Sequence, residues 1–258
     1  MKRASCLAIG LLTCASLAAP QGEETEQAPA TAKGLYKAYE AEFRLAYDAW
    51  RRPWLAARRR GDTKAATALE KQDPTGSFLP RFAAAAARYA GTEDAVPFLL
   101  WTLTHARYGR GDPSKPLATL IAAHIKSKQL ERLPIVLALR VTREGADRTK
   151  ALELQARIAA KNPHPEIATN ALYWRSWIIS ETPGNAGEHK RAVADLKKAL
   201  AIAGGQMPAR CRSLLFEFEH LQIGMTAPEI EAEDIDGQVF RLTDYRGKVV
   251  MLSFWGDW

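Results

Sequence analysis

The sequence has only three cysteines among its 258 residues, and two of them, Cys6 and Cys14, fall within the first 19 positions. Only Cys211 lies beyond that segment, and a single thiol cannot form an intramolecular disulfide. Disulfide cross-links therefore cannot stabilise residues 20–258. Nothing around Cys211 resembles a nucleophile site, so we interpret it as a small buried apolar side chain. The alternative is a thiol that is free, capped or paired with another molecule.

Several motifs that identify enzymes are also missing. The sequence contains no glycine-rich phosphate loop, no dinucleotide-binding fingerprint and no nucleophile elbow. Its histidines share no spacing of the kind that binds zinc; they are His105, His124, His164, His189 and His220. We therefore assign no catalytic residue, no cofactor and no metal from these patterns.

Long hydrophobic runs are absent too, since no stretch reaches the roughly 20 apolar residues that a transmembrane helix needs. Residues 1–18 have instead the pattern of a secretory signal, with a charged start, a short apolar core and small residues at its end: Lys2-Arg3, Ala4–Leu12 and Ser16–Ala18. We expect an exported protein of the periplasm or cell envelope. The alternatives are an ordinary N-terminal helix and a lipoprotein anchored at Cys14, because residues 11–14 approximate a lipobox.

The charge is moderately positive. The net charge of +7 becomes +5 when Lys2 and Arg3 are removed with the signal. Such an excess favours solubility and weak attraction to anionic surfaces, and does not by itself indicate nucleic acid. A basic run is interleaved with Trp50 and Trp54 and could bind an acidic partner or a phosphate backbone; it consists of Arg51, Arg52, Arg58, Arg59 and Arg60. We favour a solvated helix face, and no nucleic-acid partner, because an exported protein rarely meets nucleic acid.

Residues 19–33 are polar and rich in Pro and Ala, and we predict a disordered linker there. From 34 to 203, apolar side chains recur every three or four positions, the period of helices with one buried face. We expect Pro53 to kink or end the first of these helices, whose stripe is Tyr36, Tyr39, Phe43, Tyr47 and Trp50.

Five more stripes predict further helices in this region. Pro97 is acceptable only in a first turn, and Gly204-Gly205 should end the last helix. The stripes are Phe78, Phe82, Ala85 and Tyr89; Val96, Leu99, Leu100 and Leu103; Ala151, Leu154 and Ile158; Ile167, Ala171, Trp174 and Ile178; and Val193, Leu196 and Leu200.

The helical region contains a weak internal sequence repeat. Leu99-Leu100-Trp101 corresponds to Leu172-Tyr173-Trp174, 73 residues later. That offset equals two helical hairpins of about 36 residues, a size that suits a tetratricopeptide-like array. No hairpin carries a full repeat signature, so an irregular helical bundle is an equal alternative.

The pattern changes near the end of the chain. Residues 204–223 are predicted to be a linker or arm, with a short helix or extended stretch from Ser213. Asp236-Gly237 is a hairpin turn signal, followed by a short strand at 239–242. Residues 249–254 are almost continuously apolar and predict a strand buried on both faces of a sheet. The predicted fold class is mainly α, with only a β-hairpin at the end.

The last 35 residues contain four motifs in order, which are Gly224–Pro228, Asp236-Gly237, Leu242–Lys248 and the run Phe254, Trp255, Gly256, Asp257, Trp258. This order resembles the start of a redoxin domain, in the thioredoxin-like superfamily of envelope disulfide oxidoreductases and thiol-specific antioxidants. The family pattern continues from F-W-x-x-W into C-x-x-C. The resemblance thus implies that residues 254–258 flank the active site and that Trp258 directly precedes its nucleophile.

The resemblance implies thiol–disulfide exchange or peroxide reduction in the full-length protein, with protein thiols, disulfides or peroxide as partners. The C-x-x-C pair itself is absent from the sequence, so we expect this chain to be inactive and residues 224–258 to dock loosely or fold unstably. We consider three explanations for the missing pair: a UGA codon for selenocysteine, a frameshift and a genuine truncation. The alternative function is a non-catalytic helical-repeat module that binds a protein partner in the envelope.

Overall fold

The computed structural model describes residues 31–106, 110–182, 184–202 and 207–253. The predicted signal, residues 19–30 of the predicted linker, Gly204-Gly205 and the motif residues 254–258 lie outside the described residues. Within them the fold is mainly α, as the sequence predicts, with a single two-stranded sheet near the C-terminal end.

The first helix, α1 (Ala32–Arg59), is capped by the Thr31 side chain, which accepts a hydrogen bond from the Gly34 amide. Of the two outcomes expected at Pro53, a kink or an end, the end is wrong, because α1 continues through Pro53 to Arg59. The short helix α2 (Thr63–Glu70) packs along this part of α1, where the Trp50 indole donates to the Leu69 carbonyl at 2.6 Å. This packing offsets the loss of the backbone hydrogen bond that a proline cannot donate.

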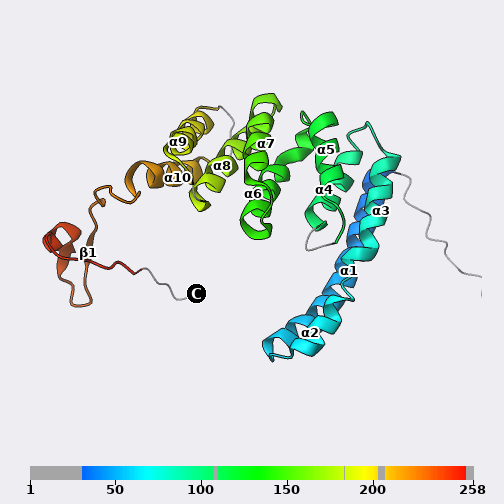
Figure 1. Ribbon diagram of the computed structural model, residues 1–258, viewed down its shortest axis with the longest axis horizontal. Coiled ribbons are helices and arrows are strands. Elements are labelled where there is room, and N and C mark those ends of the chain that lie inside the picture. Colours follow the sequence, from blue (N-terminus) through cyan, green and yellow to red (C-terminus); the bar gives the residue numbers. More distant parts are fainter. Residues whose placement is uncertain (1–30, 107–109, 183, 203–206, 254–258) are drawn as a thin grey trace, which may run out of the picture.

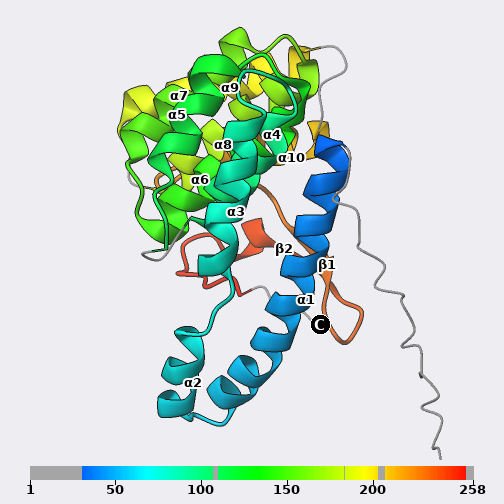
Figure 2. The same cartoon turned by 90° about the vertical axis from the view of Figure 1, so that its right-hand side faces the viewer.

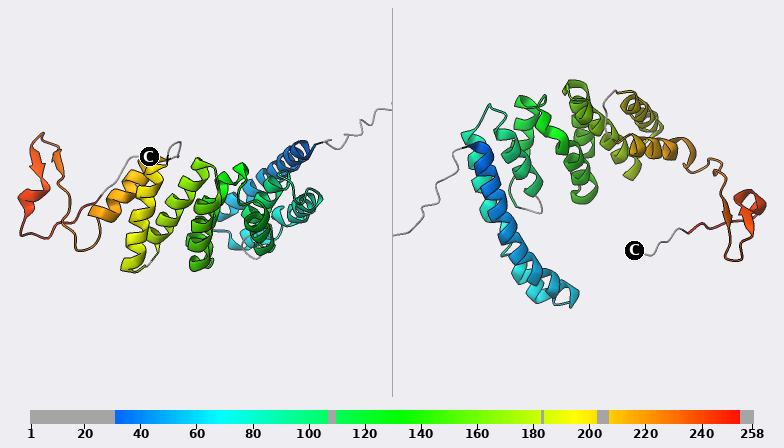
Figure 3. Two further views of the ribbon diagram at one scale, coloured as in Figure 1. Left: turned by 90° about the horizontal axis from the view of Figure 1, so that it is seen from above. Right: turned by 180° about the vertical axis from the view of Figure 1, so that it is seen from behind.

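After α2, the chain forms a series of helical hairpins that lie side by side in chain order (Figures 1 and 3). Their first helices begin at Thr75, Ser114, Arg148 and Ala186, at intervals of 39, 34 and 38 residues. The observed arrangement is therefore the helical-repeat alternative. The elements are α3 (Thr75–Arg88), α4 (Ala95–His105), α5 (Ser114–Ala123), η1 (Lys128–Arg132), α6 (Leu133–Glu144), α7 (Arg148–Lys161), α8 (Pro165–Glu181), α9 (Ala186–Ala201) and α10 (Pro208–His220).

The apolar stripes face inward and form two core clusters along the array. The first is centred on Phe82 and Phe98, and the second on Ile178 and Leu196, all fully buried. Phe82 stacks on Trp101 with ring centroids 3.6 Å apart and an interplanar angle of 7°, which joins α3 to α4. Helices of this length gain most of their stability from such packing rather than from intrinsic propensity.

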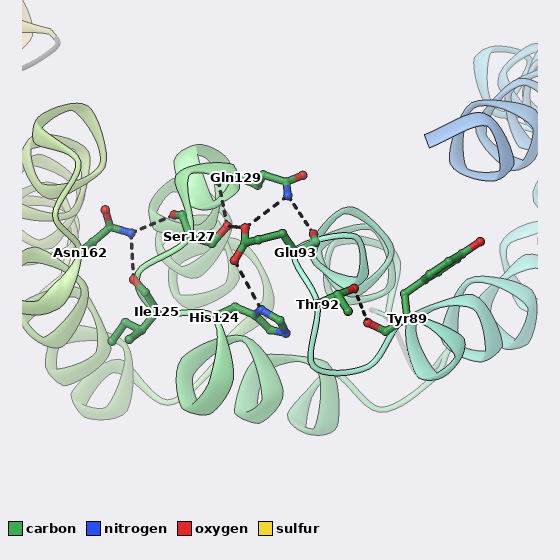
Figure 4. A network of polar contacts seen from close by, with 8 residues as sticks. All are labelled: Tyr89, Thr92, Glu93, His124, Ile125, Ser127, Gln129 and Asn162. Carbon is green, nitrogen blue, oxygen red and sulfur yellow. Dashed lines mark hydrogen bonds and ion pairs between the residues drawn. The ribbon is translucent and has the colours of Figure 1, made fainter. Parts of the chain in front are cut away.

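Polar contacts connect the loops of successive hairpins (Figure 4). Glu93, before α4, accepts hydrogen bonds from Ser127 and, through its carbonyl, from Gln129 at 2.8 Å. The buried Asn162 amide donates to the carbonyls of Ile125 and Ser127 at 2.8 and 3.0 Å. These bonds satisfy buried loop carbonyls and fix the stacking of neighbouring repeats.

The segment 204–223, predicted to be a linker or arm with a short helix or extended stretch from Ser213, contains a helix that starts earlier and packs on the array. Helix α10 starts at Pro208 and buries three side chains, Cys211, Leu214 and Phe218, in the second core cluster. Phe218 also meets the His189 ring of α9 edge-on at 5.0 Å. The array therefore continues to His220, because these three residues supply an apolar stripe that the basic residues around Cys211 obscure in the sequence.

Beyond α10, the chain forms a small antiparallel hairpin at the opposite end of the array from α1 (Figure 1), so that it lies behind α1 in the end-on view of Figure 2. Strands β1 (Glu231–Glu233) and β2 (Val239–Arg241) pair with Ala232 opposite Phe240, and the one-turn helix η2 (Leu242–Tyr245) follows. The expected turn at Asp236-Gly237 is present, with Gly237 at φ 77°.

The predicted strand at 249–254 is wrong for its described part, residues 249–253, which have no regular secondary structure. These residues are exposed and take no part in the two-stranded sheet of β1 and β2. An unpaired strand leaves its backbone amides and carbonyls to water, so the apolar sequence alone does not form one here.

Candidate functional site

The redoxin-like segment is held together by Glu229. Its carboxylate accepts hydrogen bonds from the Thr243 hydroxyl at 2.6 Å and the Thr243 amide at 3.1 Å, and from the Ile230 amide at 3.1 Å. The Thr243 hydroxyl is the main cause of a lowered pKa for this carboxyl. The contact joins the residue after the Gly224–Pro228 motif to the Leu242–Lys248 motif, so two separate parts of the resemblance meet in space.

Hydrogen bonds and an ion pair also stabilise the β1–β2 hairpin of this segment. Arg241 forms an ion pair with Glu231 across the strands at 2.7 Å, and its amide donates to Asp244 at 2.9 Å. In the turn, the Asp234 carboxylate accepts from the amides of Asp236 and Gln238, both at 2.9 Å. The acidic residues that precede the turn are exposed, and some of them take part in these contacts.

The five residues that the resemblance implies flank an active site, Phe254, Trp255, Gly256, Asp257 and Trp258, lie outside the described residues. The segment that leads to them follows η2 through Gly247, at φ 82°, and is exposed and without regular secondary structure from Val249 to Ser253. Apolar side chains are exposed along this whole end of the chain: Leu221, Ile223, Met225, Ile235, Val239, Val249, Val250, Met251 and Leu252.

Cys211 does not supply a thiol to this segment. It is free and fully buried on α10, as the sequence predicts, and burial raises the pKa of its thiol. Since the thiolate is the nucleophile in disulfide exchange, a buried thiol with a raised pKa is unreactive at neutral pH. Cys211 therefore acts as a core side chain.

Among the described residues, no group of three or more His, Cys, Asp and Glu side chains is arranged to hold a metal ion. In the same part of the chain, no helix is long and apolar enough to cross a membrane. The basic run is exposed on the C-terminal part of α1, as predicted for a solvated helix face.

A second candidate site is a groove between α1 and α4, which the sequence does not reveal. Its volume is about 800 Å³, and η1 closes one side through Gln129 and Arg132. Buried aromatic side chains of both helices line it, namely Phe43, Phe98 and Trp101, together with the half-buried Tyr36 and Tyr47. The stripe on α1 was visible in the sequence, but its partner helix is about 50 residues away, so only the fold shows that part of the stripe borders a groove.

Charged residues surround these aromatic rings. The groove is lined by four exposed basic side chains, Lys33, Lys37, Arg44 and Arg132, and by two acidic ones, Glu40 and Asp94. None of the four basic residues takes part in an ion pair among the described residues. Burial, then the Glu40 charge, raises the pKa of Tyr36, so its phenol remains a hydrogen-bond donor at neutral pH.

Comparison with known proteins gives matches of limited length. The chain is 56% identical over 36 residues to the thiol-disulfide oxidoreductase ResA of Geobacillus thermodenitrificans, which covers 14% of this chain and 21% of that protein. ResA of Geobacillus kaustophilus is 53% identical over 36 residues, with the same coverage. ResA of Bacillus thuringiensis subsp. konkukian is 42% identical over 40 residues, covering 16% of this chain and 23% of that protein.

The chain thus spans about a fifth of the length of these curated relatives. No family model matches it. No solved structure matches it either. These matches indicate a thioredoxin-like relationship for a short part of the chain.

Proposed function

We propose that residues 224–258 are the first part of a thioredoxin-like domain that carries out thiol–disulfide exchange. The observation that carries this proposal is the similarity to ResA, 56% identity over 36 residues, which has the length of this segment. We infer that the match falls there, since the segment has the family's ordered motifs. The contact between Glu229 and Thr243 supports the proposal, because it joins two of those motifs in one folded unit.

The reactive group has to come from outside the described residues. In thioredoxin-like proteins the nucleophile follows the F-W-x-x-W motif at the start of a helix, where backbone amides and the helix dipole stabilise the thiolate. Cys211 cannot replace it, because it is buried and its thiol pKa is raised. We propose that residues 1–258 alone do not catalyse thiol–disulfide exchange, because their one thiol beyond the predicted signal, Cys211, is buried. In the selenocysteine hypothesis, the codon after that for Trp258 is UGA and encodes the nucleophile.

The direct genetic test is to sequence about 100 codons beyond that for Trp258, enough for the rest of a small domain. A UGA codon followed by two residues, a cysteine and further strand and helix patterns supports the selenocysteine proposal. A cysteine codon at that position supports a thiol enzyme. A reading frame without any such continuation contradicts the proposal of a redox domain.

The biochemical test joins this chain, after Trp258, to the remainder of ResA from Geobacillus thermodenitrificans. We expect the chimera to catalyse reduction of insulin disulfides by dithiothreitol. Two controls are expected to be inactive: the chimera with both C-x-x-C cysteines changed to serine, and the ResA remainder without residues 224–258. A chimera no more active than its serine variant contradicts the proposal.

We also propose that the protein is exported to the periplasm or cell envelope, since residues 1–18 have the pattern of a secretory signal. Fusion of residues 1–25 to alkaline phosphatase, which is active only after export, tests this in a bacterial host. Changing Lys2 and Arg3 to Glu should abolish the activity of the fusion. Unchanged activity after that substitution contradicts signal-dependent export.

A second candidate function is binding of a protein partner by the helical array. The observation that favours it is the groove between α1 and α4, a concave site with aromatic and charged walls on an extended array. Both functions can reside in one chain, with the array selecting a partner and the redox segment acting on it. Cross-linking of the full chain in its native envelope, followed by identification of the linked proteins, tests this function.

A further inference from the structure

We propose that the groove between α1 and α4 binds an extended acidic peptide of a partner protein, with an aromatic side chain of that peptide packed on the aromatic wall formed by Phe43, Trp101 and Tyr36. The inference rests on the proposed binding role of the helical array and names the site and the chemistry of the partner.

The shape of the groove suits a peptide. Its lining on α1 extends from Ala32 to Tyr47, a rise of about 22 Å at 1.5 Å per residue. An extended peptide of about seven residues, at about 3.3 Å each, has this length. The volume of about 800 Å³ lies at the upper end of the range for ligand pockets, and the site is an open groove between two helices.

The groove offers two kinds of contact. Phe43 meets Trp101 edge-on at 5.0 Å and His105 edge-on at 5.0 Å, while His105 stacks on Trp101 at 3.9 Å. These rings are fixed in place by one another, so an aromatic side chain of the peptide meets a rigid surface with little loss of conformational entropy in the protein. Aromatic residues of this kind supply much of the binding energy at protein interfaces.

Charge determines which peptides fit. Lys33, Lys37, Arg44 and Arg132 outnumber the two acidic residues of the groove, and none of the four forms an ion pair in the described part of the chain. Lys33, Lys37 and Arg44 lie on one side of α1 at intervals of four and seven residues, so they form a row along the groove. A peptide with carboxylates on both sides of an aromatic residue matches this row, whereas a basic peptide is repelled.

The test measures fluorescence anisotropy of a fluorescein-labelled peptide with glutamates on both sides of a central phenylalanine, titrated with the full 258-residue chain. We expect saturable binding that weakens with added salt. A peptide with lysines in place of the glutamates, and one with alanine in place of the phenylalanine, should each bind at least about tenfold more weakly. Equal binding of the lysine peptide overturns the proposal, and so does absence of saturable binding.

Charge-reversal variants locate the site. We expect the double variant Lys37→Glu/Arg44→Glu to lower the affinity about tenfold or more. The matched control, Arg59→Glu/Arg60→Glu, makes the same change in net charge at the far end of α1. It lies about 22 Å from Arg44 and beyond the screening length, so binding should stay within about twofold. All four side chains are exposed, and thermal unfolding followed by circular dichroism verifies that both variants fold. Equal effects of the two double variants overturn the proposal.

Other occupants of the groove give different results. Residues 20–30 contain Glu23, Glu24 and Glu26, and if they occupied the groove, their deletion would raise peptide affinity about tenfold or more. A dimer in analytical ultracentrifugation that the Lys37→Glu/Arg44→Glu variant dissociates would identify a second copy as the occupant. Either result overturns the proposal of a partner peptide, and monomeric chains with unchanged affinity after the deletion support it.

One further outcome separates this inference from the proposed binding role. If the full chain and its Lys37→Glu/Arg44→Glu variant cross-link to the same partner with equal yield, the groove inference is overturned. The binding role of the array is then retained at another surface.

Discussion

Arg148 and Glu188 form a bidentate ion pair that joins α7 to α9, with nitrogen–oxygen distances of 2.8 and 3.1 Å. Arg148 also donates to the Thr182 hydroxyl at 2.7 Å, and Glu188 completes a capping box with Asn185 at the start of α9. Both charged side chains are largely removed from water. The pair therefore fixes how the last hairpin stacks on the one before it.

Replacing Glu188 by Gln removes this ion pair. Hydrogen bonds to charged groups contribute about 1.5–3 kcal/mol, and partial exposure reduces that, so we expect a loss of about 1–2 kcal/mol in the free energy of unfolding at pH 7. Urea unfolding followed by circular dichroism measures it. The control Glu153→Gln, on the exposed side of α7, should change stability by less than about 0.5 kcal/mol. Equal stability of the two variants contradicts the role of the pair.

The same pair predicts a pH dependence. The hydrogen bonds from Arg148 are the main cause of a lowered pKa for Glu188, relative to its ordinary value of 4.5. A carboxyl with a lowered pKa in the folded state stabilises the fold above pH 4.5, and this contribution is lost as the pH falls through the lowered pKa. We expect the slope of unfolding free energy against pH below 4.5 to be flatter in Glu188→Gln than in the wild type, and unchanged in Glu153→Gln.

Phe82 is predicted to be the most sensitive position in the first core cluster. It is 0% exposed, stacks on Trp101 and meets Tyr36 and Tyr39 edge-on. Phe82→Ala should destabilise the chain by about 3–5 kcal/mol in urea unfolding, because the cavity it leaves cannot collapse. Leu45→Ala, at a position 75% exposed, should cost less than about 0.5 kcal/mol. A Phe82→Ala loss below about 1 kcal/mol would mean that this core is loosely packed.

Cys211 should be inert in the folded chain, since it is buried and burial raises its thiol pKa. The measurement uses the variant Cys6→Ser/Cys14→Ser, which retains Cys211 as its single cysteine. We expect no reaction with Ellman's reagent at pH 8 in the native state and complete reaction of this thiol in guanidinium chloride. Rapid reaction of the native variant would show an accessible thiol and reopen a redox role for Cys211.

The helices were predictable because their signal is local. The stripe from Phe78 to Tyr89 and the stripe from Val96 to Leu103 identify α3 and α4, and the position of Pro97 in a first turn is confirmed. The path of α1 through Pro53 was not predictable, because it depends on the contact between Trp50 and Leu69 in another helix. Helix propensity gives the free-energy cost of a proline within a helix. Packing against other helices decides whether the helix continues despite that cost.

The sites were less predictable than the helices. The motifs of the redoxin-like segment are continuous in sequence and could be recognised directly. The groove requires α1 to lie beside α4, and the contact of Arg148 with Glu188 spans 40 residues. The strand expected at 249–254 was predicted from an apolar run alone. Such a run becomes a strand only where it pairs with a neighbouring strand, which the local sequence does not reveal.

The proposed function requires residues 224–258 to be part of a thioredoxin-like domain. Amide hydrogen exchange of residues 249–253 tests it most directly. In the 258-residue chain these amides should exchange at rates close to those of an unfolded peptide, while amides of α8 around Ile178 remain protected. In the active-site chimera with the ResA remainder, the account predicts strong protection of residues 249–253, because they become a paired central strand. Amides that exchange equally fast in both proteins would contradict the claim.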